Sequence, residues 1–368
     1  DGAAAPALPA TGASAVVADV ASPVLAAGGI AESVPMGGVA KVITALVVLD
    51  AKPMPAGSTG GTITIGAADV AGQQQYTAEE ARTVGVAAGE TWTQRDAMRA
   101  MLLGSSNNHA DTLARWAYGS VDAFLDAAHA WLAERSLTGI TLVDATGLDE
   151  DDLGTASDLA RVSALAFSEA SIAEIMAEDD AVVPGNRRVD NLAAYQAELG
   201  YTGLSRSYTD QAGVCFLFAL TVPAAGGTGE GVTLYGAFIR EPDWDTLDGD
   251  LAALASTSAA SLTQTAVVTD GQAFVTYTTP WGATAHGVAM ATESRMLWAT
   301  TALDYTVDAK PIRTGNQGQQ VGTVTVHTPD EDVTVMLELD QRIGDPGPLW
   351  RLTNPVPVIT AFLESRTG

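Results

Sequence analysis

The sequence predicts an α+β domain followed by an all-β domain. Strand-like runs lie at both ends of the first 262 residues and enclose a helical middle, which is the segregation of strands and helices typical of an α+β fold. From residue 263 onward β-branched residues alternate with other residues, as expected for an all-β module. We therefore assign residues 1–13 to a linker, 14–262 to the α+β domain and 263–368 to a β-rich C-terminal domain.

The first expected elements are a strand hairpin and a buried helix. Small and β-branched residues alternate over residues 14–30, and Pro23 and Gly28-Gly29 interrupt them, which is typical of a hairpin. Residues 39–49 are apolar almost all round, so we expect a helix at the centre of the domain. It should end near Lys52, because Pro53 follows.

Helical patterns fill the middle of the first domain. Thr93 and Ser157 are the expected N-caps of two of these helices, because Asp96 and Asp158 place an acidic residue in each first turn. Strand-like runs flanked by glycines then resume. We expect helices over 93–103, 108–117, 121–135 and 157–167, strands over 201–222 and 231–239, and in the second domain strands at 266–268, 274–277, 322–326 and 333–337.

Composition and charge exclude several classes of partner. Hydrophobic residues make up 47% of the chain and charged residues 17%, which is ordinary for a folded globular protein. The net charge of −26 repels nucleic acid and anionic membrane surfaces, so we expect neither as a partner. No export signal is visible, and we expect the chain to begin after a removed export or anchor segment. Any membrane attachment would then come from a segment outside this sequence.

The sequence gives no support for a metal or a cofactor. The single cysteine, Cys215, excludes an internal disulfide and lies in an apolar run, where we expect a buried, inert thiol. The four histidines lack the spacing of zinc ligands. The acidic run from Asp149 to Asp152 lacks the spaced pattern of a calcium loop, so we interpret it as a solvated loop. We expect no cofactor and no metal.

The first of three motifs lies at residues 34–46, which read Val-Pro-Met-Gly-Gly-Val-Ala-Lys-Val-Ile-Thr-Ala-Leu. This segment resembles the S-x-x-K motif of the serine-type D-alanyl-D-alanine carboxypeptidases, low-molecular-mass penicillin-binding proteins related to the serine β-lactamases. The resemblance implies their fold, with the motif at the start of a central helix, its serine as nucleophile and its lysine as general base. Gly38 stands at the serine position, whereas Lys41 keeps the lysine.

The second motif is intact. Ser105-Ser106-Asn107 resembles the S-x-N motif of the family. The resemblance implies that Ser105 relays a proton to the leaving amine and that Asn107 orients the substrate.

The third motif is replaced. Residues 203–213 resemble the family's K-T-G strand, but Ser205, Arg206 and Ser207 stand where lysine, threonine and glycine are expected, and Tyr208 follows them. By resemblance these four residues lie on the substrate-binding side. Shorter similar pieces at 144–148, 155–161, 311–313 and 320–324 extend the resemblance over nearly the whole chain.

These departures fall on the chemistry, because a glycine offers no hydroxyl for acyl transfer. Ser105 is the alternative nucleophile, but it would attack from the wrong side of the pocket. Arg206 could replace the lost positive charge, yet it stands one residue out of register, so on a regular strand it points away from Ser205 unless the strand is bulged. The structural alternatives are a solvated surface charge for Arg206 and purely structural roles for Lys41, Ser105 and Asn107.

We interpret the chain as an exported cell-envelope relative of these carboxypeptidases that has lost catalysis and binds a peptidoglycan stem peptide or an envelope protein partner. The alternative is an active or residually active D-Ala-D-Ala carboxypeptidase, a peptidoglycan hydrolase, with a rearranged nucleophile or with Gly38 introduced to trap substrate. Deliberate replacement explains Gly38 but not the changes at 205–207. Drift after loss of function explains both.

Overall fold

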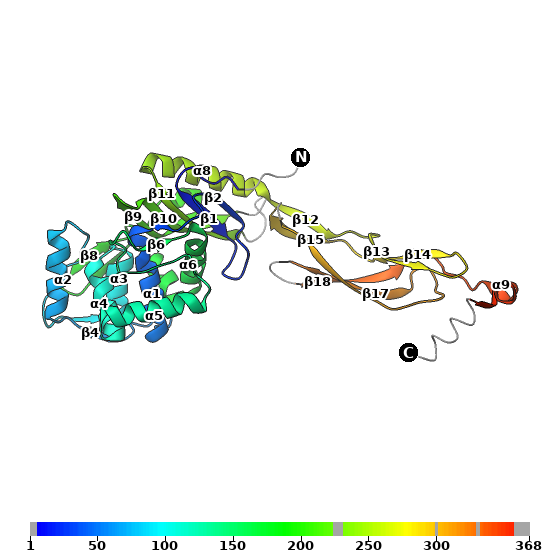
Figure 1. Cartoon of the computed structure of the whole chain (residues 1–368), viewed down its shortest axis with the longest axis horizontal. Helices are drawn as coiled ribbons and strands as arrows, with labels where there is room; N and C mark the ends of the chain where they lie inside the picture. The colour runs from blue at the N-terminus through cyan, green and yellow to red at the C-terminus, as the bar shows by residue number, and fades with distance from the viewer. Residues whose placement is uncertain (1–5, 224–230, 299–300, 329–331, 357–368) are drawn as a thin grey trace. The chain divides into compact units, whose positions relative to one another are not determined.

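Two units, divided between Ser261 and Leu262, make up the chain in the computed structural model. The structure describes residues 6–223, 231–298, 301–328 and 332–356. The predicted fold class is confirmed, since the first unit mixes helices with an antiparallel sheet and the second is built mainly of strands (Figure 1).

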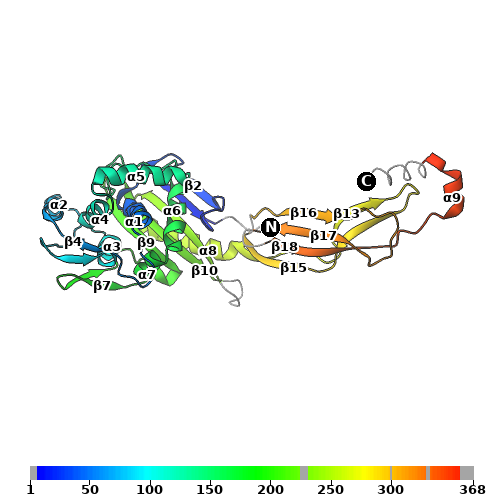
Figure 2. The same ribbon diagram turned by 90° about the horizontal axis from the view of Figure 1, so that it is seen from below.

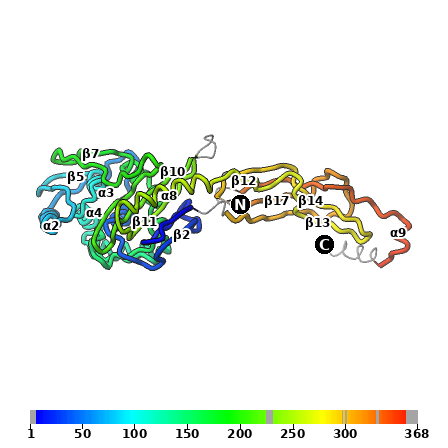
Figure 3. The backbone as a smooth tube through the Cα atoms, turned by 90° about the horizontal axis from the view of Figure 1, so that it is seen from above, coloured from blue at the N-terminus to red at the C-terminus, as the bar shows by residue number. Residues whose placement is uncertain are grey.

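The first unit is organised by a five-stranded antiparallel sheet with the order β2-β1-β11-β10-β9. The predicted hairpin is present, because β1 (Ala13–Val17) pairs with β2 (Ala26–Gly29). β1 also pairs with β11 (Val232–Glu241), which follows it at a long distance in sequence (Figure 3). β10 (Gly213–Val222) lies next to β11, and β9 (Tyr201–Thr209) is the edge strand.

Helices cover both faces of this sheet. α6 (Ala156–Ser168) packs on β1, β10 and β11, and α8 (Trp244–Ser261) contacts β10 and β11 from the opposite side (Figure 1). α1 (Ala40–Ala51) contacts α6 on one side and the helices of the middle region on the other. Every residue from Ala40 to Leu49 is buried, as the all-round apolar pattern predicts.

The helical middle follows the predicted segments with one wrong N-cap. Thr93 caps α3 by accepting a hydrogen bond from the backbone N–H of Asp96. Ser157 does not cap α6, because the helix already begins at Ala156 and Thr155 is the N-cap, which accepts from the N–H of Asp158. The remaining elements here are α2 (Ala67–Ala78), α3 (Gln94–Leu102), α4 (Asn107–Tyr118), α5 (Val121–Glu134), α7 (Ala170–Met176), the short helices η1 (Gly37–Val39) and η2 (Ala197–Leu199), and the short strands β3 (Val34–Pro35), β4 (Thr62–Thr64), β5 (Thr91–Thr93), β6 (Leu153–Gly154), β7 (Asp180–Val183) and β8 (Arg187–Asp190).

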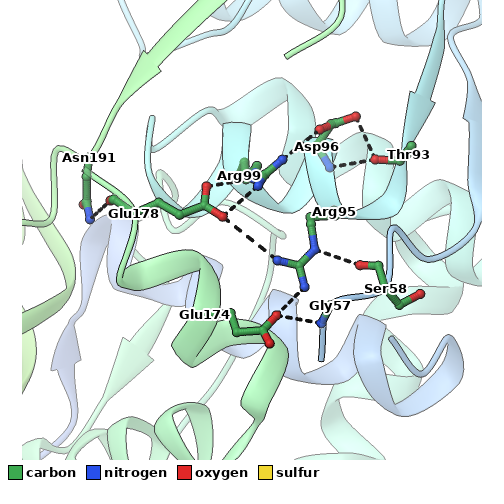
Figure 4. Close-up of polar contacts among 9 residues, drawn as sticks. All are labelled: Gly57, Ser58, Thr93, Arg95, Asp96, Arg99, Glu174, Glu178 and Asn191. Carbon is green, nitrogen blue, oxygen red and sulfur yellow. Dashed lines mark hydrogen bonds and ion pairs between the residues drawn. The ribbon is translucent and has the colours of Figure 1, made fainter. Parts of the chain in front are cut away.

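A polar cluster joins α3 to α7 and its flanking residues (Figure 4). Arg99 donates to both carboxylate oxygens of Glu178, at 2.8 and 2.7 Å. Arg95 donates to Glu174 and to the carbonyl of Ser58. Asn191 donates to the Glu178 carbonyl. The cluster therefore fixes α3, whose C-terminal end leads directly to the Ser105 loop.

The second unit has its own core, formed by buried residues of its strands, including Val324, Leu337 and Leu339. β13, β14, β18, β17 and β16 form a five-stranded sheet in that order, and β12 pairs with β15 (Figure 2). In the described parts of the chain, no helix has the length and apolar character needed to cross a bilayer. The bounds are β12 (Leu262–Val268), β13 (Ala273–Thr278), β14 (Thr284–Ala289), β15 (Glu293–Trp298), β16 (Asp304–Ala309), β17 (Gln320–His327), β18 (Asp332–Leu339) and α9 (Gly347–Thr353).

Candidate functional site

Gly38 lies in η1, at the entrance to α1, and faces the edge strand β9. A Cβ atom added to Gly38 would lie 3.1 Å from the Cβ of Ser207 and 3.2 Å from the Nζ of Lys41. Such contacts are tight, because carbon atoms prefer separations of about 3.5–4.0 Å. The two changed motifs therefore meet in one contact, in which Ser207 occupies space next to the missing side chain.

Lys41 is buried one helical turn beyond Gly38. Its Nζ donates a hydrogen bond to the carbonyl of Thr146 at 2.9 Å. Burial lowers the pKa of Lys41 to about 8, although the nearby carboxylate of Asp144 opposes this shift. At neutral pH most of the Lys41 side chains are thus protonated, but the ammonium group loses its proton more easily than that of an exposed lysine.

The loop that holds Lys41 is built around two aspartates. Asp144 accepts hydrogen bonds from the N–H groups of Gly147 and Asp149, at 2.7 and 3.1 Å, and backbone hydrogen bonds help to keep its pKa low against the opposing effect of burial. Gly147 has φ +80°, and a Cβ there would lie 1.9 Å from the carbonyl oxygen of Gly37, so only glycine fits.

The interpretation of the acidic run as a solvated loop is wrong for Asp152. This residue is fully buried, and one of its oxygens accepts hydrogen bonds from the N–H groups of Val143 and Asp144. Burial, followed by the charge of Asp144, raises the pKa of Asp152 to about 8. No cluster of three or more His, Cys, Asp or Glu residues suited to a metal ion occurs among the described residues.

Ser105 lies in the loop between α3 and α4, and Asn107 is the first residue of α4; both line the same groove as Gly38 and Lys41. Ser105 adopts a left-handed conformation with φ +51°, which is uncommon for a residue other than glycine. The Asn107 side chain donates to the carbonyl of Arg82 at 3.0 Å. Its Oδ1 atom is buried and has no hydrogen-bond partner among the described residues, so an acceptor remains free beside the groove.

A second serine in this loop has a structural role. Ser106 accepts from the N–H of Val84 at 3.0 Å and lies 2.9 Å from Nδ1 of His109. Although a serine next to a histidine is a common nucleophile and base pair, both residues are fully buried. Burial also lowers the pKa of His109 to about 3. The pair cannot reach a substrate and instead fixes the loop.

The residues at the K-T-G positions of β9 line two different cavities. The pairing of β9 with β10 shifts in register beside Ser205. Ser205 lines a small cavity below the groove, whereas Ser207 and Tyr208 line the groove itself. Arg206 borders both and is not a solvated surface charge, because it is only partly exposed and its guanidinium carbon lies 4.6 Å from the ring centre of Tyr195 and 5.3 Å from that of Trp244.

The groove has a volume of about 730 Å³. The structure brings Gly38, Lys41, Ser105, Asn107, Arg206, Ser207 and Tyr208 together around it, and leaves Ser205 outside. Sequence reasoning missed Arg82 and Trp244, which also line it. Arg82 lies in an irregular segment without a motif, and Trp244 begins α8, so only the folded chain places them beside β9.

Comparison with known proteins gives a consistent family match. The sequence model described as D-alanyl-D-alanine carboxypeptidase matches residues 2–223. No curated protein sequence matches the chain in the corresponding search.

Solved structures of this kind are similar in fold. A D-alanyl-D-alanine carboxypeptidase from Mycobacterium tuberculosis is 27% identical, with a TM-score of 0.56 over 69% of this chain and 93% of that one. Penicillin-binding protein 6B from Escherichia coli is 16% identical, with a TM-score of 0.64 over 90% of this chain and 96% of that one. Penicillin-binding protein 5 from Haemophilus influenzae is 15% identical, with a TM-score of 0.63 over 92% and 99%.

Proposed function

This chain belongs to the D-alanyl-D-alanine carboxypeptidase family, and from that premise we propose that it has lost acyl transfer and acts in the cell envelope as a noncatalytic binding protein. Its ligand would be a peptidoglycan stem peptide, and a protein partner in the envelope is the second possibility. The observation that carries the proposal is the absence of a hydroxyl at position 38, next to the lysine that would activate it.

Neither serine near Gly38 is a suitable replacement. The Oγ atom of Ser207 is buried and has no hydrogen-bond partner among the described residues, so a substrate carbonyl cannot approach it. Ser105 borders the groove, but it comes from the opposite wall, where the family motif has its proton relay. We therefore assign neither of them the role of nucleophile.

The remaining features support binding. The groove is open, and Lys41, Ser105 and Asn107 line it as in the intact motifs. No other lysine replaces the lost lysine of the third motif, because neither Lys52 nor Lys310 borders the groove, but Arg206 places a positive charge there. A ligand can thus be held without being cleaved.

The test is incubation with a labelled penicillin followed by intact-mass measurement. We expect no covalent adduct, while an active penicillin-binding protein treated in parallel gains the full mass of the reagent. A stoichiometric mass gain located on a serine would overturn the proposal. It would instead favour the second candidate, a carboxypeptidase with a rearranged nucleophile, for which the presence of Ser105 and Lys41 in the same groove is the supporting observation.

A further inference from the structure

The groove gathers three basic side chains that form no ion pair with a described residue. Lys41, Arg82 and Arg206 all line it, and no salt bridge joins any of them to a residue that the structure describes. Most of the described arginines do pair with carboxylates, among them Arg99 and Arg187. Although the chain has a net charge of −26, three cations without an ion pair to a described residue gather around this one cavity.

These cations repel one another. Burial is the main reason why the pKa of Lys41 and that of Arg206 are lowered. Asp144 raises the pKa of Lys41 and Tyr195 raises that of Arg206, whereas the charge of Arg82 lowers both. Placing like charges around one cavity costs free energy in the empty protein, and a bound anion offsets that cost.

Arg206 is held in place without using its hydrogen-bond donors. Its guanidinium lies over the rings of Tyr195 and Trp244. Tyr195 is itself fixed, because its hydroxyl donates to Asp248 and its ring packs on Phe216. No described residue accepts a hydrogen bond from the Arg206 side chain, so its five N–H donors remain available to a ligand.

The carboxylates of the groove do not neutralise this charge. Glu79, Glu80 and Asp210 line the same groove but are exposed. Asp210 is engaged by the hydroxyl of Tyr208 at 3.1 Å. Water and salt strongly screen the charges of these exposed carboxylates and of the exposed Arg82, whereas the charges of the buried Lys41 and the half-buried Arg206 are screened much less. The carboxylate of Asp144 favours the charged form of Lys41 but forms no ion pair with it.

We propose that the groove binds a ligand with two carboxylates, one held by the guanidinium of Arg206 and the other by Lys41 and Arg82. One carboxylate can occupy only one guanidinium in the bidentate manner and would leave the other cations unpaired. The inference rests on the proposed function and names the ligand class of the same site: a peptide with a side-chain carboxylate in addition to its free C-terminus.

The test measures binding of three peptides by calorimetry. N-acetyl-D-aspartyl-D-alanine has both carboxylates, its D-asparaginyl analogue has only the C-terminal one, and its C-terminal amide has only the side-chain one. We expect the first to bind about 10- to 100-fold more tightly than either analogue, as typical for one charged hydrogen-bonded contact. Equal affinities for all three peptides would overturn the inference.

Variants locate the two contacts. Arg206→Gln and Arg82→Gln should each remove most of the advantage of the dicarboxylate, whereas Arg206→Lys should keep part of it because the charge remains. Arg188→Gln is the matched control, since Arg188 is exposed and paired with Asp180 and Asp190. If Arg206→Gln binds like the parent while its thermal unfolding is unchanged, the inference fails.

Proton uptake gives a readout that a structural role of these residues would not produce. The pKa of Lys41 is about 8 in the empty groove, and a neighbouring carboxylate raises it, so binding at pH 8 should take up a fraction of a proton. The binding enthalpy should then depend on the ionisation enthalpy of the buffer. Asp152, whose pKa is also about 8 and whose charge acts on Lys41, can contribute to this uptake. Lys41→Met should therefore reduce the dependence, and Lys41→Met combined with Asp152→Asn should abolish it. Tyr208 does not contribute, because its hydrogen bond to Asp210 raises its pKa further above this range.

These results are independent of the penicillin test. Absence of a penicilloyl adduct together with equal peptide affinities would refute the two-carboxylate site and leave the loss of catalysis intact. An adduct together with selective dicarboxylate binding would refute the loss of catalysis and leave the ligand class intact.

Discussion

Gly38 and Ser207 are the residues at which the two degenerate motifs touch. By comparison with the family motifs, Gly38 stands where a serine is expected, at the entrance to α1. Ser207 stands where a glycine is expected, on β9. The Cβ of Ser207 lies where it would crowd a Cβ at position 38, at 3.1 Å. The total volume across the contact is therefore roughly conserved, as core packing requires.

This exchange predicts coupling between the two positions. Gly38→Ala should destabilise the protein by about 1–2 kcal/mol through overpacking, whereas in a Ser207→Gly background the same change should be neutral or stabilising. Urea unfolding of the parent, both single variants and the double variant gives the coupling free energy.

Gly72→Ala is the control for this cycle, because Gly72 lies in α2 and a Cβ there meets nothing within 4 Å. It should stabilise the protein by about 0.5–1 kcal/mol. If the changes in the free energy of unfolding at positions 38 and 207 were additive, the contact between Gly38 and Ser207 would make no contribution to stability.

The residue-level predictions came from motifs with fixed spacing. Gly38, Lys41, Ser105 and Asn107 were predicted from motifs, and the structure places all four at one groove. The surroundings of Arg206 could not be predicted, because they depend on a register shift in β9 and on the ring of Trp244, which comes from another element.

At the scale of elements, patterns with a clear period were the predictable ones. α1 is apolar on all sides and lies where the sequence places it. α2 and α8 were not predicted. α2 buries only Asp69 and has no apolar stripe. In α8 the buried leucines Leu247, Leu251 and Leu254 have helical spacing, but alanines on the other faces obscure the pattern. Their helical state is set by contacts with the rest of the unit.

The α3 to α7 cluster predicts a measurable stability contribution (Figure 4). Glu178→Gln should lower the free energy of unfolding by about 1–2 kcal/mol, because it removes the charge from a carboxylate that Arg99 binds with two N–H groups. Thermal or urea unfolding measures the change.

Asp190→Asn serves as the matched control for Glu178→Gln. Asp190 also pairs with an arginine, Arg188, but both side chains are about two-thirds exposed, at 66% and 68%. The effect should stay within about 0.5 kcal/mol. If both variants lost equal stability, the partly buried position of the cluster would have no special importance.

At the scale of the whole molecule, the family fold is retained while residues of two motifs differ from the family pattern. α1, the Ser105 loop and β9 belong to different parts of the chain and meet only because the sheet and the helical region pack together. The fold of the family is therefore retained even where the residues of its motifs differ. In a catalytic site of this kind several groups act as a unit. The effects on the rate of changing residues on two of its three walls should therefore not be additive.

Repair of the site should therefore be cooperative. Gly38→Ser alone supplies a hydroxyl beside Lys41, but Ser207 crowds it and nothing anchors the substrate carboxylate as the K-T-G lysine would, so activity should remain poor. Ser205→Lys, Arg206→Thr and Ser207→Gly together restore the strand motif but leave no nucleophile. The turnover rate of the variant with all four changes should exceed that of either partial repair by at least about 100-fold, because positioning and nucleophile then act together.

The measurement is release of D-alanine from diacetyl-Lys-D-Ala-D-Ala by the parent, both partial repairs and the combination. Release by the parent at a rate that none of these changes affects would mean that another nucleophile is at work and that the chain is an enzyme after all.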